Sequence, residues 1–101
     1  MGKEDYRSKK NLRARIIISG RVQGVLFRDS MKRQARKIGV FGWVRNIKSW
    51  KVEAIIEGDE IKVLKLIDWA HKGPLLAKVD NIDIFWEDYK KEFDDFIIKY
   101  N

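Results

Sequence analysis

Residues 13–38 read RARIIISGRVQGVLFRDSMKRQARKI, and this stretch predicts the first strand and the first helix of the fold. Apolar residues alternate over residues 13–20, which is typical of a largely buried β-strand. After a loop that contains glycine, apolar side chains recur every three or four residues, and this spacing predicts a helix over residues 27–38. Gly39 stands where a C-terminal cap of this helix is expected. The apolar face of the helix consists of Phe27, Met31, Ala35 and Ile38.

A β-hairpin is expected after this helix. The sequence predicts strands at residues 40–48 and 51–57, with Ser49 and Trp50 in the short turn between them. In the second of these strands every other residue is apolar, so one face of the hairpin is expected to be buried.

A second helix and two further strands complete the chain. Asp59 is expected to cap the helix at its start, and Gly73 followed by Pro74 is expected to end it. Strands are then predicted at residues 79–86 and 96–100. The apolar face of this second helix consists of Val63, Leu66, Ile67 and Ala70.

The predicted order is therefore strand, helix, strand, strand, helix, strand, with a short extra strand at the C-terminal end. In a small domain this order predicts an α+β fold of the ferredoxin-like split βαβ type (βαββαβ), an antiparallel sheet with both helices on one face. The same architecture occurs in enzymes, metal carriers, RNA binders and regulatory modules, so the function has to be sought in the loops.

Length and composition limit the functions to consider. The chain has 101 residues, which fits one domain, and we expect a flexible basic arm at residues 1–12 before a folded domain at residues 13–101. It has no cysteine and a single histidine, which argues against disulfides, thiol nucleophiles and a metal site built from several histidines. No apolar run approaches the roughly 20 residues that span a bilayer. A cytoplasmic protein without membrane contact is expected.

Positive charge is concentrated in the first half of the chain. Residues 1–51 carry a net charge of +12 and residues 52–101 a net charge of −5, which together give the +7 of the whole chain. An anionic partner is therefore expected at the N-terminal half. Composition leaves open whether the charge serves a nucleic acid, a small anionic substrate or solubility.

The loop between the first strand and helix has the features of an anion site. Residues 19–28, SGRVQGVLFR, end at a helix N-terminus, where unpaired N–H groups and the helix dipole attract negative charge. Gly24 allows the backbone to curl so that successive N–H groups point inward, and Arg28 adds a fixed charge with a planar fork of donors. By itself this pattern fits equally well a structural turn followed by a surface arginine.

Asn46 is the second candidate. It ends the segment GWVRN at residues 42–46, and the predicted topology brings the end of this strand toward the loop that opens the first helix. A neutral amide at that place could hold a water molecule. The more common role of such a residue is to close a hairpin turn.

Together these segments resemble the acylphosphatase family. The resemblance rests on SGRVQGVLFR at residues 19–28 and GVFGWVRN at residues 39–46, and it extends over about residues 13–101. It implies a small ferredoxin-like enzyme that hydrolyses the carboxyl-phosphate bond of acyl phosphates, giving a carboxylate and inorganic phosphate, with neither metal nor cofactor.

The resemblance also implies roles for individual residues. Arg28 corresponds to the phosphate-binding arginine, and Asn46 to the asparagine that orients the attacking water. Phosphate or sulfate is expected as a product-like ligand, and the protein is expected to be a monomer. The backbone N–H groups that correspond to the phosphate cradle belong to Gln23, Gly24, Val25, Leu26, Phe27 and Arg28.

The sequence departs from the family at the hairpin that follows Asn46. Members usually have threonine or leucine next and a glycine at the turn, whereas Ile47 and Trp50 stand here. Because tryptophan disfavours positive φ, a different turn geometry is expected.

Two alternatives to a free-standing enzyme are considered. One is an RNA-binding module of the same fold, which usually carries aromatic residues on adjacent central strands. The first strand offers none, so nucleic acid is not the expected partner. The other alternative is a domain that serves a larger carbamoyl-transfer enzyme, whose N-terminal part resembles acylphosphatase. The sequence favours the enzyme that acts by itself.

Overall fold

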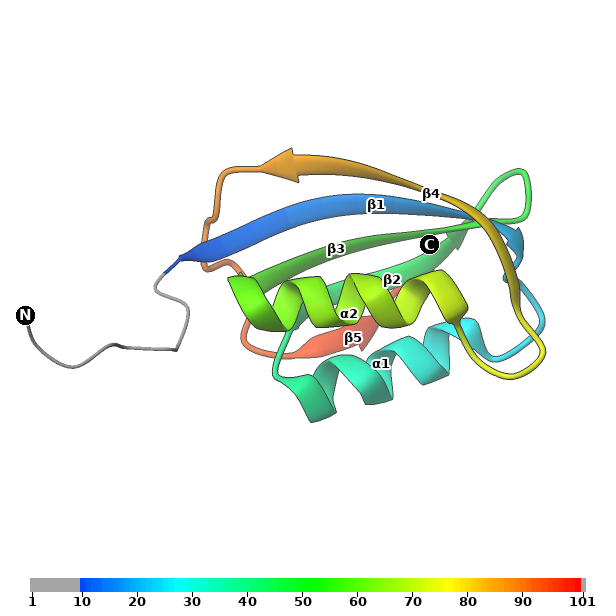
Figure 1. Cartoon of the computed structure of the whole chain (residues 1–101), viewed down its shortest axis with the longest axis horizontal. Coiled ribbons are helices and arrows are strands. Elements are labelled where there is room, and N and C mark those ends of the chain that lie inside the picture. Colours follow the sequence, from blue (N-terminus) through cyan, green and yellow to red (C-terminus); the bar gives the residue numbers. More distant parts are fainter. Residues whose placement is uncertain (1–9, 101) are drawn as a thin grey trace, which may run out of the picture.

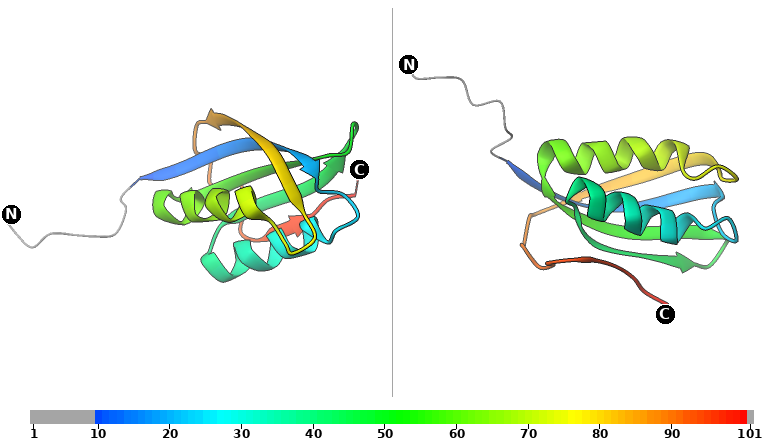
Figure 2. Two further views of the ribbon diagram at one scale, coloured as in Figure 1. Left: turned by 45° about the vertical axis from the view of Figure 1, so that its right-hand side comes forward. Right: turned by 90° about the horizontal axis from the view of Figure 1, so that it is seen from below.

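The computed structural model of the chain describes residues 10–100. The chain forms strands and helices in the predicted order, and both helices lie on the same side of the sheet (Figures 1 and 2). The elements are β1 (Asn11–Arg21), α1 (Phe27–Ile38), β2 (Phe41–Ile47), β3 (Lys51–Asp59), α2 (Glu60–Lys72), β4 (Lys78–Glu87) and β5 (Phe96–Ile98).

The sheet has the strand order β4-β1-β3-β2-β5. The first four of these strands pair antiparallel, as the ferredoxin-like prediction requires, and that fold is confirmed. The short extra strand differs from the prediction of an antiparallel sheet, because β5 pairs parallel to β2. The reason is the path of the chain, which passes from β4 around the end of the sheet and enters at its opposite edge (Figure 1).

Each predicted helix face is buried against the sheet. On α1, Phe27, Met31 and Ala35 belong to the core, and Ile38 packs against it. The Phe27 ring contacts the Trp69 ring on α2 at a centroid distance of 5.5 Å, so the two helices also pack against each other. The buried residues of α2 are Val63, Leu66, Ile67 and Ala70, as predicted.

The predicted helix ends are also confirmed. Asp59 caps α2, since its Oδ2 accepts hydrogen bonds from the backbone N–H groups of Ile61 and Lys62. Gly39 caps α1 with a φ of 99°, and its N–H donates to the carbonyl of Ala35. A glycine takes this left-handed conformation without the steric cost that a β-carbon would add.

The boundary between arm and domain lies earlier than predicted. β1 begins at Asn11, and Asn11 and Leu12 pair with Asp59 and Gly58 of β3. These two residues were expected in the flexible arm because residues 1–12 show no apolar period. They are ordered because β3 runs on to Asp59 and offers them hydrogen-bonding partners. The rest of the predicted arm, residues 1–9, lies outside the described residues.

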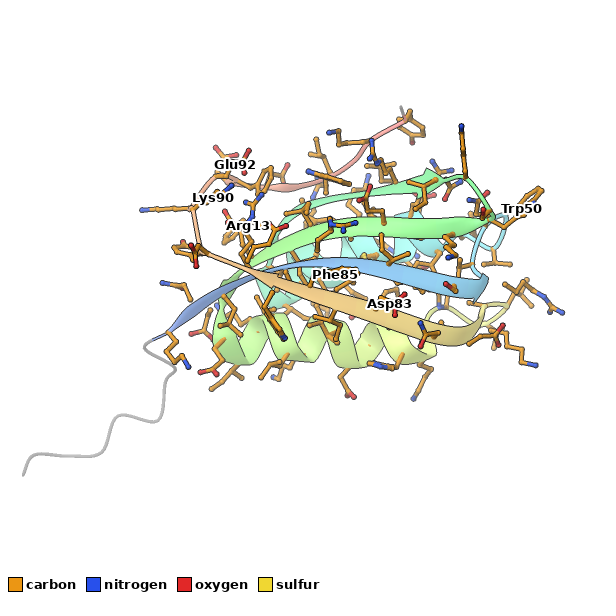
Figure 3. All side chains as sticks on the ribbon, turned by 90° about the horizontal axis from the view of Figure 1, so that it is seen from above. Arg13, Trp50, Asp83, Phe85, Lys90 and Glu92 are labelled. Atoms are coloured by element: carbon orange, nitrogen blue, oxygen red, sulfur yellow. The ribbon has the colours of Figure 1, made fainter. Side chains whose placement is uncertain are left out.

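The hairpin turn does not have the altered geometry that was expected. Ser49 and Trp50 both have positive φ, 69° and 61°, which is the conformation that glycine would favour. Such a conformation costs on the order of 1–3 kcal/mol for a residue other than glycine. The Trp50 side chain is 74% exposed and projects from the tip of the hairpin (Figure 3). The backbone at the tip of the hairpin is therefore strained.

Several ion pairs lie on the face of the sheet that has no helices, where Figure 3 labels Arg13. Arg13 and Glu57 are both buried there and pair at 3.2 Å. Glu57 also accepts hydrogen bonds from the N–H groups of Glu92 and Phe93, and Arg13 binds the carboxylate of Glu92 at 2.8 Å. These contacts fasten the segment between β4 and β5 to the sheet, and so they help to fix where β5 begins.

Candidate functional site

A pocket of about 190 Å³ opens where the β1–α1 loop, the end of β2 and the C-terminal segment meet. In Figure 2 the loop and the hairpin tip lie at the same end of the molecule. The predicted residues Arg28 and Asn46 both line this pocket, so the structure brings the two sequence motifs together. The complete lining is Val22, Gly24, Leu26, Phe27, Arg28, Asp29, Asn46, Ile98 and Tyr100.

The backbone of the loop curls in the way that an anion cradle requires. Gly24 and Leu26 have positive φ, 75° and 64°, on either side of Val25. Alternation between left-handed and ordinary conformations turns successive N–H groups toward a common centre. Leu26 is the N-cap of α1 and makes no side-chain capping hydrogen bond, so no side chain of the cap occupies the first N–H groups of the helix. The helix start is therefore open toward the pocket.

Asn46 lies inside β2 rather than in the turn. It pairs with Val52, while Ile47 and Lys51 form the last pair before the tip, so Asn46 does not close the hairpin. Its Oδ1 atom is buried and has no hydrogen-bond partner among residues 10–100. A buried polar atom without a partner costs about 1–3 kcal/mol. A water or ligand in the pocket is the group that could satisfy it.

Arg28 is the second residue of α1 and is half-buried at the pocket wall. Its guanidinium carbon lies 5.2 Å from the centre of the Tyr100 ring. Within the described part of the chain no carboxylate forms an ion pair with Arg28. The positive charge thus stays available to an anion, and the Tyr100 ring restricts where the guanidinium can lie.

Only some of the residues predicted for the phosphate cradle line the pocket. Gly24, Leu26 and Phe27 line the pocket beside Arg28, whereas Gln23 and Val25 are not among the lining residues. Val25 packs against the core instead. The Gln23 carboxamide turns toward the hairpin.

Four pocket residues were missed by sequence reasoning. Ile98 and Tyr100 come from the C-terminal segment, and only the parallel pairing of β5 with β2, in which Ile98 lies opposite Val44, brings them there. The alternating sequence of a three-residue strand does not indicate which strand it pairs with, or whether the pairing is parallel or antiparallel. Of the other two, Val22 lies within the recognised segment of residues 19–28, and Asp29 directly follows it.

Comparison with known proteins identifies the family. The acylphosphatase family model matches residues 14–98, which is most of the chain. The chain belongs to the acylphosphatase family. An acylphosphatase hydrolyses the carboxyl-phosphate bond of an acyl phosphate, and the chain is a hydrolase of this class.

Individual acylphosphatases agree with this assignment. The chain is 57% identical over 79 residues to an acylphosphatase of Thermococcus kodakarensis, and these aligned residues cover 78% of this chain and 87% of the relative. It is also similar to the crystal structure of acylphosphatase from Bacillus subtilis, with a TM-score of 0.84 and 34% identity, covering 88% of this chain and 99% of the other.

A larger protein contains a similar unit. The chain resembles part of full-length HypF, with a TM-score of 0.77 and 28% identity, but it matches only 12% of that protein's length. The acylphosphatases named above are matched over most of their length.

In this acylphosphatase the C-terminal wall of the pocket is anchored through Asp95. Its carboxylate accepts a hydrogen bond from the N–H of Phe96 at 2.7 Å and binds Arg36 at 3.0 and 3.1 Å. Its carbonyl accepts the N–H of Gly42 on β2 at 2.9 Å. The hydrogen bond from Phe96, followed by the Arg36 guanidinium, holds the pKa of the Asp95 carboxyl below its usual value of 3.8. The anchored strand then carries Tyr100 to the pocket.

Over residues 10–100, no three or more histidine, cysteine or carboxylate side chains are grouped so that they could hold a metal ion. No helix in that range is long and apolar enough to cross a membrane.

Proposed function

We propose that the pocket is the active site, and that an acyl phosphate binds there with its phosphoryl group in the β1–α1 loop. The N–H groups of residues 23–28 and the guanidinium of Arg28 hold the phosphoryl oxygens, and Asn46 holds the attacking water. The observation that carries this proposal is Asn46 Oδ1, a buried acceptor without a partner among the described residues, in the same pocket as Arg28 and the start of α1.

The reaction needs few protein groups. An acyl phosphate is an activated mixed anhydride, and its carboxylate leaves as a weak base, so a general acid is dispensable. The water oxygen forms a bond to phosphorus while the bond from phosphorus to the acyl oxygen breaks. The products are a carboxylate and inorganic phosphate, and the water proton passes to the phosphate and the solvent.

Charge stabilisation and alignment supply the catalysis in this proposal. The transition state of phosphoryl transfer spreads negative charge over three equatorial oxygens, and these would face the loop N–H groups and Arg28. The positive end of the α1 dipole acts on the same oxygens. Asn46 accepts a hydrogen bond from the water, so that one lone pair of the water points at phosphorus.

Hydrolysis is proposed to need no metal ion or cofactor. Support comes from the donor set, because the groups around the pocket are N–H donors, a guanidinium and a carboxamide, and Asp29 is the one carboxylate among the lining residues. Divalent metal sites in proteins are built mainly from several carboxylate or imidazole ligands. Inorganic phosphate and sulfate are proposed to bind in the same loop as product-like ligands.

The protein is proposed to work as a monomer in the cytoplasm. The groups assigned to the reaction, which are the loop N–H groups, Arg28 and Asn46, meet within a single chain. The absence of cysteine from the sequence is compatible with a reducing compartment.

An RNA-binding role is not supported by the open face of the sheet. The central strands β1 and β3 present Glu53 and Glu57 there, paired with Arg13 and Arg15. Both glutamates are buried, and two carboxylates at the centre of this face would repel a phosphate backbone. No aromatic side chain of β1 or β3 is available to stack a base, since neither strand contains one.

The test is a direct assay of acetyl phosphate and benzoyl phosphate hydrolysis, with and without a strong chelator. We expect the same rate in both conditions and competitive inhibition by inorganic phosphate. Activity that disappears in chelator and returns with Mg²⁺ contradicts the proposed mechanism. Noncompetitive inhibition by phosphate would place its binding site outside the loop.

A further inference from the structure

The side chain of Gln23 ties the β1–α1 loop to the base of the β2–β3 hairpin. Its Nε2 donates hydrogen bonds to the carbonyl oxygens of Ile47 and Lys51, each at 2.9 Å. Ile47 and Lys51 are the last paired residues before the hairpin tip. One carboxamide therefore joins the loop to both strands of the hairpin at once.

The two ends of this link are adjacent to the two halves of the site. Gly24, which follows Gln23, lines the pocket, and so does Asn46, which precedes Ile47. A change in the separation between loop and hairpin would move the N–H cradle relative to the Asn46 carboxamide. The Gln23 side chain does not line the pocket itself.

The hydrogen bonds of Gln23 are made next to a strained part of the hairpin. Its tip contains Ser49 and Trp50 with positive φ, a strained conformation in an exposed turn. The hydrogen bonds of Gln23 stabilise the pair just below the tip, where the carbonyls of Ile47 and Lys51 accept them.

We propose that Gln23 is a positioning residue for the reaction, because its carboxamide sets the distance between the phosphate-binding loop and Asn46. This inference rests on the proposed function, in which the loop holds the phosphoryl group and Asn46 the water. The cradle itself is shaped by the backbone of Gly24 and Leu26 and by the start of α1, none of which needs the Gln23 side chain. Loss of the link should therefore harm alignment more than phosphate binding.

The first test replaces Gln23 by methionine, which has a similar length and volume but no donor. In Gln23→Met we expect kcat to fall roughly 10- to 100-fold, since a displacement of about 1 Å between reacting groups can have an effect of that size. KM and the inhibition constant of inorganic phosphate should remain close to wild type. Gln34→Met, the same change on the half-buried side of α1, is the matched control and should keep wild-type kcat.

A double-mutant cycle separates positioning from a merely structural role. If Gln23 acts through Asn46, then Gln23→Met should slow the Asn46→Ala enzyme little or not at all. A full additional loss in the Asn46→Ala background would overturn the inference. A phosphate inhibition constant that rises in step with the loss of kcat would also overturn the inference, because Gln23 would then contribute to phosphate binding.

Each failure has a distinct meaning. If Asn46→Ala keeps its kcat, the proposed function fails whatever Gln23 does. If Asn46→Ala is inactive but Gln23→Met keeps full kcat, only the inference about Gln23 fails. If Gln23→Met does not fold, Gln23→Asn replaces it in the test. Its carboxamide stands on a shorter side chain and reaches fewer acceptors. The inference then requires that Gln23→Asn shows a reduced kcat with unchanged phosphate binding.

Discussion

The guanidinium carbon of Arg28 lies 5.2 Å from the centre of the Tyr100 ring, so the start of α1 meets the C-terminal segment across the pocket. Tyr100 is 80% exposed, and a cation–π contact in such a place is worth about 0.5–1 kcal/mol. The C-terminal segment thus does more than extend the sheet. It helps to hold the charged group that the proposed mechanism uses.

Tyr100→Ala is therefore expected to weaken phosphate binding modestly. The loss of the ring contact corresponds to a rise of roughly 2- to 5-fold in the inhibition constant of phosphate. Tyr100→Phe keeps the ring and should behave like wild type. Equal losses in the two variants would mean that the hydroxyl, and not the ring, is what matters.

Arg28→Gln should lower both substrate affinity and turnover. The variant has a shorter, neutral side chain and so removes a fixed charge from the phosphoryl group. The combined loss in kcat/KM should be about 2.7–4 kcal/mol if Arg28 acts like other oxyanion donors. The phosphate inhibition constant should rise at the same time. Arg33→Gln, an exposed position on the same helix, is the control and should change neither value. Unchanged phosphate inhibition in Arg28→Gln contradicts its role as the phosphate ligand.

Two glycine variants should fail for different reasons. A β-carbon at Gly24 would meet no atom within 4 Å, so Gly24→Ala should fold and should weaken phosphate binding through its φ of 75° alone. A β-carbon at Gly42 would overlap the backbone carbonyl of Ile55 on β3. Gly42→Ala is expected to disrupt the pairing of β2 with β3 and to lose the native fold. Thermal unfolding followed by circular dichroism, together with phosphate inhibition, distinguishes these outcomes, and a stable Gly42→Ala protein would contradict the packing described here.

Asp95 should make the stability depend on acid pH. The Phe96 N–H and the Arg36 guanidinium lower the pKa of Asp95 in the folded state, so its carboxylate contributes stability above its unfolded value of about 3.8. That contribution is lost as the pH falls through the lower pKa of the folded protein. The difference in unfolding free energy between wild type and Asp95→Asn should therefore shrink as the pH is lowered from about 5 toward 2. A difference that stays constant over this range would show that Asp95 does not titrate with folding.

The sequence predicted the elements more reliably than their contacts. The apolar spacing from Phe27 to Ile38 gave the bounds of α1, because the period of a helix face depends on local sequence alone. The parallel pairing of β5 could not be predicted, since the register and direction of a three-residue strand depend on the segment that precedes it. The same is true of Tyr100, which reaches the pocket only through that pairing.

At the hairpin and in the β1–α1 loop, contacts between segments outweighed the preferences of single residues. Trp50 adopts positive φ although it has a large side chain, because that side chain lies in solvent and the paired strands hold the backbone on both sides. Gln23 was expected only as a backbone donor in the cradle. Its side chain binds two carbonyls of the hairpin, a contact between segments that no pattern in the loop indicates.

The central claim is that Asn46 holds the attacking water while the loop and Arg28 hold the phosphoryl group. Steady-state kinetics of Asn46→Ala with benzoyl phosphate tests it most directly, combined with phosphate inhibition and a circular dichroism spectrum. We predict that kcat collapses while KM, the phosphate inhibition constant and the spectrum stay close to wild type, because only the contact to the nucleophile is removed. A folded Asn46→Ala enzyme that keeps nearly full kcat would contradict the account.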